Sequence, residues 1–169
     1  FGELTALWAA GVINDSDYLM LARSRGQAMA APKDTSVDTG TMIAVVGSPA
    51  KVAMDIKDIN DISIANYNSN NQVVVAGVTS QIAIAIDELK AKGYKVVPLP
   101  VSVAFHTPLV GHAQKPFAAA IDNAKFNKPS VPVYSNGTAK AHQNNANEIK
   151  KSLKNHILES VHFNEEIDN

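Results

Sequence analysis

The chain has 169 residues, of which 46% are hydrophobic and 18% are charged, and its formal net charge is −1. This length fits one domain, or one domain that carries an insertion, and the composition is that of an ordinary globular protein. The near-neutral charge offers no electrostatic surface for nucleic acid or an anionic membrane, and no apolar run is long enough to span a bilayer. Cysteine is absent, which excludes disulfides, thiolate chemistry and cysteine metal sites and is expected of a cytoplasmic protein.

The first part of the chain predicts two helices and a linker. We expect an apolar helix at 3–10, a second helix at 17–30 and a polar linker at 33–40. Gly11 is placed to stop the first helix, Asn14 can cap the second, and Pro32 ends it.

The middle of the chain gives the clearest architectural signal. We expect a strand at 42–46, a helix at 49–59, strands at 62–66 and 72–76, a helix at 79–92 capped by Thr79, and a strand at 94–99. The polar cluster at 68–71 is a turn, so the two central strands form a hairpin. The order β-α-β-β-α-β is that of the ferredoxin-like split motif.

The last part predicts helices at 108–125 and 146–160, a short strand at 131–134 and a polar tail at 164–169 that closes no element. Together these elements indicate an α/β protein in which a ferredoxin-like subdomain is inserted into a larger α/β domain. We expect the larger domain to be formed by 1–40 and 101–169, and the inserted subdomain by 41–100.

Three positions are candidates for catalytic or binding roles. Gly2, at the start of an apolar helix, fits the second glycine of a nucleophile elbow G-x-S-x-G, which would put the serine immediately before Phe1. His106 lies between a strand-like run and a helix, where it could act as a general base. Arg25, which precedes a glycine late in a helix, could bind a carboxylate with two hydrogen bonds.

Each candidate also has a structural interpretation. Any helix can begin with Gly-Glu, His106 could be a half-buried structural histidine, and Arg25 could be a solvated surface arginine. Asn66 and Asn68 would face the same way on a continuous strand and could present amides to a cleft, although turn chemistry explains them equally well.

Two other patterns are rejected. Residues 47–51 lack the spacing of a phosphate-binding loop, and His142, His156 and His162 do not match a zinc motif, so we expect no metal.

Five segments resemble, in collinear order over the whole chain, the malonyl-CoA:acyl-carrier-protein transacylase family. Residues 1–3 read FGE, 25–29 RGQAM, 65–74 ANYNSNNQVV, 104–108 AFHTP and 156–163 HILESVHF. The corresponding family patterns are G-H-S-x-G-E, R-G-x-x-M, A-N-x-N-S-P-x-Q-V-V, A-F-H-[ST]-P and Q-L-x-x-P-V-x-[WF]. The chain departs from them at Asn70 and Ser160, where proline is usual, and at His156, where glutamine is usual.

The resemblance implies a partial α/β-hydrolase-like acyltransferase core with a ferredoxin-like insert. The nucleophilic serine, the oxyanion loop rich in glycine and glutamine, and the closing E-x-G-P segment of the family fall outside these 169 residues. The opening stretch looks most similar to the acyltransferase of polyunsaturated fatty acid synthases, which belong with the polyketide synthase acyltransferases in this family.

The implied reaction is transfer of a malonyl group from malonyl-CoA to the phosphopantetheine thiol of an acyl carrier protein through a serine acyl-enzyme, with no bound cofactor. His106 would be the general base, Arg25 would bind the malonyl carboxylate, and the backbone N–H of Phe1 would help to hold the oxyanion. Phe105 would narrow the pocket beside the α-carbon, and His156 would support His106. Met29, Asn66 and Asn68 would contribute to the substrate site.

The implied partners are an acyl carrier protein domain and the neighbouring domains of a multidomain synthase. Two other functions remain open from the sequence. One is a serine acyl hydrolase with the same elbow, which needs no carboxylate clamp. The other is a non-catalytic piece that docks a carrier protein.

Overall fold

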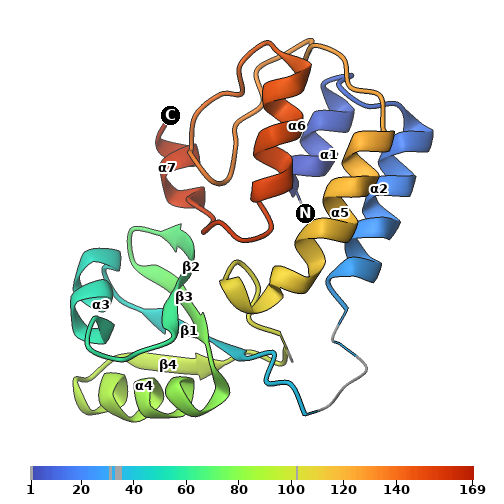
Figure 1. Ribbon diagram of the computed structural model, residues 1–169. Coiled ribbons are helices and arrows are strands. Elements are labelled where there is room, and N and C mark those ends of the chain that lie inside the picture. Colours follow the sequence, from blue (N-terminus) through green and yellow to red (C-terminus); the bar gives the residue numbers. More distant parts are fainter. Residues whose placement is uncertain (1, 31, 33–35, 102) are drawn as a thin grey trace.

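The computed structural model describes residues 2–30, 32, 36–101 and 103–169. It has an α/β region and a helical region (Figure 1). The α/β region, residues 41–98, is a four-stranded sheet with two helices. The helical region consists of the described residues on either side of this segment. As a whole the chain is a mixed α/β protein, as the sequence predicts.

The α/β region has the predicted order of elements. They are β1 (Thr41–Val46), α3 (Pro49–Ile56), β2 (Ile62–Ser69), β3 (Gln72–Gly77), α4 (Thr79–Ala91) and β4 (Lys95–Pro98). The strands lie in the order β2-β3-β1-β4, and every neighbouring pair is antiparallel. Thr79 is the first residue of α4, and its backbone N–H and hydroxyl both donate to Asp38 of the linker.

The two faces of this sheet have different partners. Ile43 and Val75 are buried in the core that the sheet shares with α3 and α4. Met42 and Val74, one position away on the same strands, are buried on the opposite face, against residues 104–109. This alternation follows from the period of two in a strand, and it leaves the second face to the site described below.

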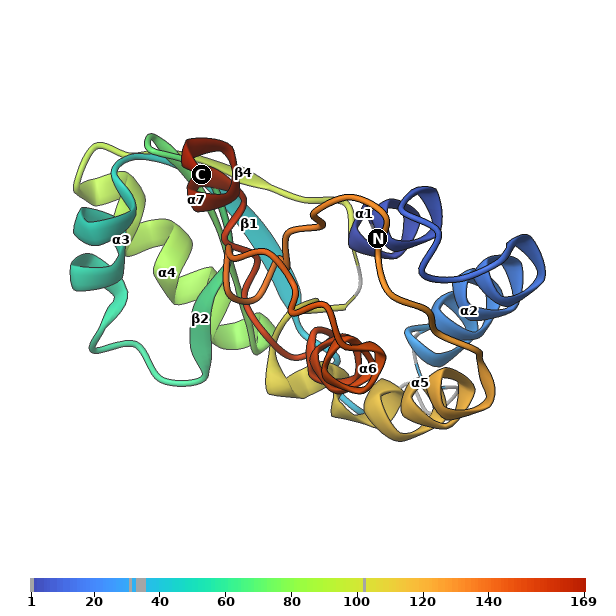
Figure 2. The same cartoon turned by 90° about the horizontal axis from the view of Figure 1, so that it is seen from above.

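The helical region is built around one apolar cluster. Its helices are α1 (Gly2–Ala9), α2 (Asp15–Ala28), the 3₁₀ helix η1 (Pro108–Val110), α5 (Gly111–Asn123), α6 (Ala146–Asn155) and α7 (Phe163–Asp168). The largest buried side chains of the cluster include Leu4, Leu7, Leu21, Phe117, Ile121 and Leu153. After α6 the chain returns to the sheet, where α7 lies against β2 (Figures 1 and 2).

Three of the expected elements are wrong in the last part of the chain. Residues 131–134 form no strand but one isolated bridge, between Tyr134 and Ala141, because Pro132 lacks a donor and no described strand lies alongside. The helix expected to reach 160 ends at Asn155, because residues 160–161 bond to β2 instead. The tail forms α7, whose last turn is held by the Asn169 side chain donating to the carbonyl of Glu165.

The helix expected at 108–125 is divided into η1 and α5. The Thr107 hydroxyl accepts from the backbone N–H of Leu109, which caps the short first turn. Across the described segments, no helix combines the length and apolar character that crossing a membrane requires.

Candidate active site

One cavity brings together side chains that are far apart in the sequence. Its volume is about 490 Å³, and it opens between α2, the second face of the sheet and the turn after β4. It is lined by Arg25, Gly26, Met29, Ala30, Met42, Asn66, Phe105 and His106. Five of the predicted site residues therefore meet here: Arg25, Met29, Asn66, Phe105 and His106.

Arg25 is a buried cation on the wall of this cavity. It lies in the last turn of α2 and is only 8% exposed, which excludes a solvated surface arginine. Burial lowers the pKa of Arg25, while the negative charge of Glu3 opposes that shift. A guanidinium begins from so high a pKa that it stays charged, so the cavity wall carries a positive charge suited to an anionic group.

His106 has an unusual backbone and a defined tautomer. Its φ of 60° lies in the left-handed region, which side-chain-bearing residues seldom occupy and which clusters at functional sites. Nδ1 lies 3.0 Å from the carbonyl oxygen of Glu159. Because a carbonyl can only accept, Nδ1 carries the proton, and the lone pair of Nε2 is left as the basic atom.

The environment keeps His106 neutral. Burial, together with the charge of Arg25, lowers its pKa to about 4, although the hydrogen bond to Glu159 acts in the opposite direction. A neutral imidazole is the form that can take a proton, and its unprotonated Nε2 is the atom that would accept it.

Asn66 reaches the cavity because of a β-bulge. The register of β2 against β3 shifts between Ile64 and Asn66, so that Asn66 pairs with Val74. Val74 belongs to the face of the sheet that carries the cavity, whereas an unbroken register would have paired Asn66 with the opposite face. A bridge to Val161 holds the other edge of β2 at this point.

Asn68 is not brought to the site. A second register shift lies between Tyr67 and Ser69, where β2 enters the hairpin turn. The Asn68 side-chain amide donates to Oε1 of Gln72 across the hairpin, at 3.3 Å. Asn68 does not line the cavity, and its contact with Gln72 fits the turn interpretation.

The apolar wall comes from both regions. Met29 packs against the core of the helical region, and Phe105 packs against the sheet cluster that contains Met42. Phe105 directly precedes His106, so the same turn delivers an aromatic ring and an imidazole to one cavity.

His156 lies behind His106 rather than in the cavity. It follows α6 directly, is 2% exposed, and its ring centroid is 5.8 Å from that of His106. Burial lowers its pKa to about 4, while the charge of Glu3 raises it. The side-chain amide of Asn136 donates to Nε2 of His156 at 3.3 Å.

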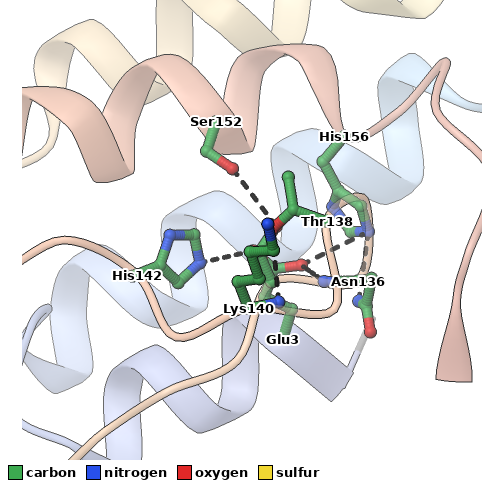
Figure 3. Close-up of polar contacts among 8 residues, drawn as sticks. Glu3, Asn136, Thr138, Lys140, His142, Ser152 and His156 are labelled. Carbon is green, nitrogen blue, oxygen red and sulfur yellow. Dashed lines mark hydrogen bonds and ion pairs between the residues drawn. The ribbon is translucent and has the colours of Figure 1, made fainter. Parts of the chain in front are cut away.

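Three residues near His156 were not among the predicted site residues. Glu3, Asn136 and His142 form a polar cluster with it, and Figure 3 shows His142 and His156 approaching Glu3 from opposite sides. A glutamate in an apolar helix was a signal for Glu3. Asn136 and His142 lie in a polar loop, and nothing in their spacing singles them out.

A second cavity, of about 630 Å³, adjoins the first at Asn66 and His106. Its polar wall includes Glu3 and Asn136, and Gly2 lies at its edge. His106 therefore lines both cavities. Phe1, the expected oxyanion donor, lies outside the described residues. Within the described ranges no three metal-binding side chains gather at one point.

The sequence and the fold both match known acyltransferases. The family described as "Acyl transferase domain" matches residues 1–169. The chain belongs to this family. The acyl transferase chain is 34% identical over 174 residues to the malonyl CoA-acyl carrier protein transacylase of Escherichia coli K12, covering 99% of this chain and 55% of that protein. It is 35% identical over 166 residues to the polyketide biosynthesis protein ThaF of Burkholderia thailandensis, covering 96% of this chain and 14% of that protein.

Solved structures agree with the sequence matches. FabD of Acinetobacter baumannii superimposes with a TM-score of 0.89 at 30% identity, covering 99% of this acyl transferase chain and 54% of that one. The acyltransferase domain of an iterative polyketide synthase of enediyne biosynthesis superimposes with a TM-score of 0.91 at 28% identity, covering 99% of this chain and 43% of that one. A malonyl transacylase solved in complex with its type II polyketide synthase acyl carrier protein superimposes with a TM-score of 0.88 at 31% identity, covering 98% of this chain and 54% of that one. The chain spans about half the length of the curated transacylases it matches.

Proposed function

We propose that this chain is the part of a malonyl-CoA:acyl-carrier-protein acyltransferase that supplies the general base and the carboxylate clamp. The observation that carries the proposal is the shared cavity of Arg25 and His106. A buried guanidinium accounts for recognition of a carboxylate, and a neutral imidazole with a free Nε2 accounts for activation of a nucleophile.

In the proposed reaction the nucleophile is a serine that immediately precedes Phe1 in the full-length protein. Nε2 of His106 takes the hydroxyl proton as the serine oxygen attacks the thioester carbonyl, and the backbone N–H of Phe1 holds the oxyanion. The CoA thiolate leaves with the proton from His106, which gives a malonyl-serine ester. His106 then takes the proton of the phosphopantetheine thiol as the sulfur attacks this ester, and it passes that proton to the serine oxygen as the ester bond breaks.

The remaining cavity residues would set the fit of the acyl group. The malonyl carboxylate would lie against Arg25, while Phe105 and Met29 would limit the space beside the α-carbon. Asn66 would present its amide between this group and His106. His156 would support the imidazole from behind.

The proposed partner is an acyl carrier protein, supported by the related transacylase that was solved with one. A place beside other domains of a multidomain synthase is supported by the similarity to polyketide synthase proteins. A polyunsaturated fatty acid synthase as the parent, and a cytoplasmic location, remain predictions from the sequence.

The proposed domain organisation is a ferredoxin-like subdomain at 41–100 between two parts, 1–40 and 101–169, of an α/β-hydrolase-like core. The strand order β2-β3-β1-β4 with α3 and α4 on one face supports the ferredoxin-like assignment. The hydrolase and the non-catalytic docking alternatives are not favoured, because the related proteins are transacylases and synthase acyltransferases.

The test compares Arg25→Ala with Arg23→Ala in the full-length protein, since Arg23 is an exposed arginine on the same helix. A charge-assisted two-pronged contact predicts that Arg25→Ala lowers kcat/KM for malonyl-CoA by about two orders of magnitude or more. Transfer from acetyl-CoA, which has no carboxylate, should be unchanged or faster. Arg23→Ala should leave both substrates unchanged.

His106→Ala completes this test, because a general base serves either acyl group. It should depress malonyl and acetyl transfer together. Equal losses for the two thioesters in Arg25→Ala would make Arg25 structural and would contradict the carboxylate clamp.

A further inference from the structure

The role of His106 as general base in the proposed function raises the question of what holds its ring. We propose that Glu3 is a positioning residue for His106, and that it acts through Asn136 and His156 in a buried array completed by His142. The array comprises these four residues: Glu3, Asn136, His142 and His156.

The Glu3 carboxylate is buried and uses both of its oxygens. Its side chain is 0% exposed, and that of His142 is 4% exposed. His142 Nε2 donates to Oε1 at 2.8 Å, and the backbone N–H of Asn136 donates to Oε2 at 2.9 Å. Burial raises the pKa of Glu3, but the hydrogen bond from His142, together with the smaller contributions of His156 and Asn136, holds it below its usual value. A buried carboxylate that accepts from both sides is fixed in place.

Asn136 transmits this order to His156. Its backbone N–H is bonded to Glu3, and its side-chain amide donates to Nε2 of His156. Oε2 of Glu3 itself lies 3.8 Å from the same nitrogen. Displacement of the carboxylate would therefore release both the asparagine backbone and its amide, and with them the only hydrogen-bond partner that the described residues give to the His156 ring.

His156 is also the first residue of the segment whose carbonyl at Glu159 binds the His106 ring. The chain leaves α6 at His156, and three residues later the carbonyl of Glu159 accepts the Nδ1 proton of His106. His156 is packed at 5.8 Å from His106, so movement of its ring would shift both the neighbouring imidazole and the acceptor. Loss of that acceptor would free the imidazole to adopt the other tautomer, with the proton on Nε2, which cannot take a proton from serine.

The charged groups around His106 include the buried cation Arg25 and the buried carboxylate of Glu3. Arg25 of α2 lowers the pKa of His106, and Glu3 of α1 counters the effect of burial on both Arg25 and His156. Glu159 and Glu166, on the other side, have raised pKa values because of burial and the charge of Glu3. Glu3 is thus the anion that balances the buried cation, while burial and the charge of Arg25 keep the imidazoles neutral.

The decisive experiment is Glu3→Gln in the full-length protein. In a primary amide an NH2 group replaces one of the two acceptor oxygens, so a donor would then face either His142 Nε2 or the backbone N–H of Asn136. We expect kcat for malonyl transfer to fall about ten- to a hundred-fold, as misplacement of a catalytic group does, with KM nearly unchanged because the Arg25 wall is intact. Glu165→Gln is the matched control, since Glu165 forms an exposed pair with His162, and it should have no effect.

The ¹⁵N NMR signals of labelled histidine give a readout that does not depend on activity. In the parent protein His106 should be the Nδ1–H tautomer, and in Glu3→Gln it should become a mixture. An unchanged tautomer together with unchanged kcat would overturn the proposal. If Glu3→Gln fails to fold, His142→Gln, which keeps a donor, and His142→Leu, which removes it, take its place: only His142→Leu should lower kcat and mix the tautomers, and equal behaviour of the two would overturn the proposal.

This design separates the two proposals. If His106→Ala retains transfer, His106 is not the general base and the proposed function fails, while the tautomer of His106 in Glu3→Gln still reports on the array.

Discussion

The α/β region and the helical region bury different kinds of side chain. The core of the α/β region, between its sheet and the helices α3 and α4, is entirely apolar. The buried polar and charged residues of the described chain all lie in the helical region: Glu3, Arg25, Thr107, Ser135 and His156. Burying a polar group costs free energy unless it is paired. The helical region therefore bears the free-energy cost of burying the polar side chains of the site, and the α/β region contributes an apolar face of its sheet.

The largest expected effect tests whether the helical region is nevertheless held by its apolar cluster. Phe117 of α5 is 0% exposed at the centre of that cluster. Phe117→Ala should reduce the free energy of unfolding by about 3–5 kcal/mol, because it removes apolar contact and leaves a cavity. Leu19→Ala, on a residue of α2 that is 66% exposed, is the control and should change it by less than about 0.5 kcal/mol. Urea denaturation measures both, and similar values would mean that Phe117 contributes no core packing.

A second prediction is that the buried histidine His156 of the helical region makes the free energy of unfolding depend on pH. Burial lowers the pKa of His156 to about 4, so between pH 6.5 and 4 the unfolded chain binds a proton that the folded chain does not. Stability is therefore intact above pH 6.5 and falls as the pH is lowered to 4, by about 3 kcal/mol from this residue. His106 acts in the same direction, and protonation of Glu3, whose pKa is lowered, removes further stability at more acidic pH.

The variant His156→Gln, which cannot titrate, should flatten this slope in urea denaturation between pH 7 and pH 4. His112→Gln is a suitable control, because His112 is an exposed histidine of α5. An identical slope in His156→Gln and the parent would show that His156 is not buried in its neutral form.

The smallest effect concerns the connection between the regions. Asp38 of the linker accepts from the backbone N–H and the hydroxyl of Thr79 and so caps α4 from outside the α/β region. Asp38→Ala should cost about 1 kcal/mol, the usual value of a helix N-cap. Asp87→Ala, at an exposed position of the same helix, should change stability by less than about 0.5 kcal/mol. Equal effects in urea denaturation would mean that the linker does not stabilise the α/β region.

The regions also differ in how well the sequence predicts them. The elements of the α/β region follow from local signals, because its strands are apolar runs bounded by turn residues and a short turn joins β2 to β3. In the helical region, residues 131–134, 156–160 and 164–169 were each assigned wrongly. Residues 160 and 161 bond to β2, and that partner, distant in sequence, ends α6 before them.

The family and the residue types of the site can be read from the sequence alone, because Arg25, Phe105 and His106 lie in short collinear motifs. Which side chains reach the cavity depends on the tertiary structure. One bulged residue in β2 turns Asn66 toward it, while Asn68 contacts Gln72 at the hairpin turn instead, and pairing register is set by packing on the two faces of the sheet. Likewise, the array around Glu3 joins loops from distant parts of the chain, and it forms because a buried carboxylate must find its donors wherever the fold places them.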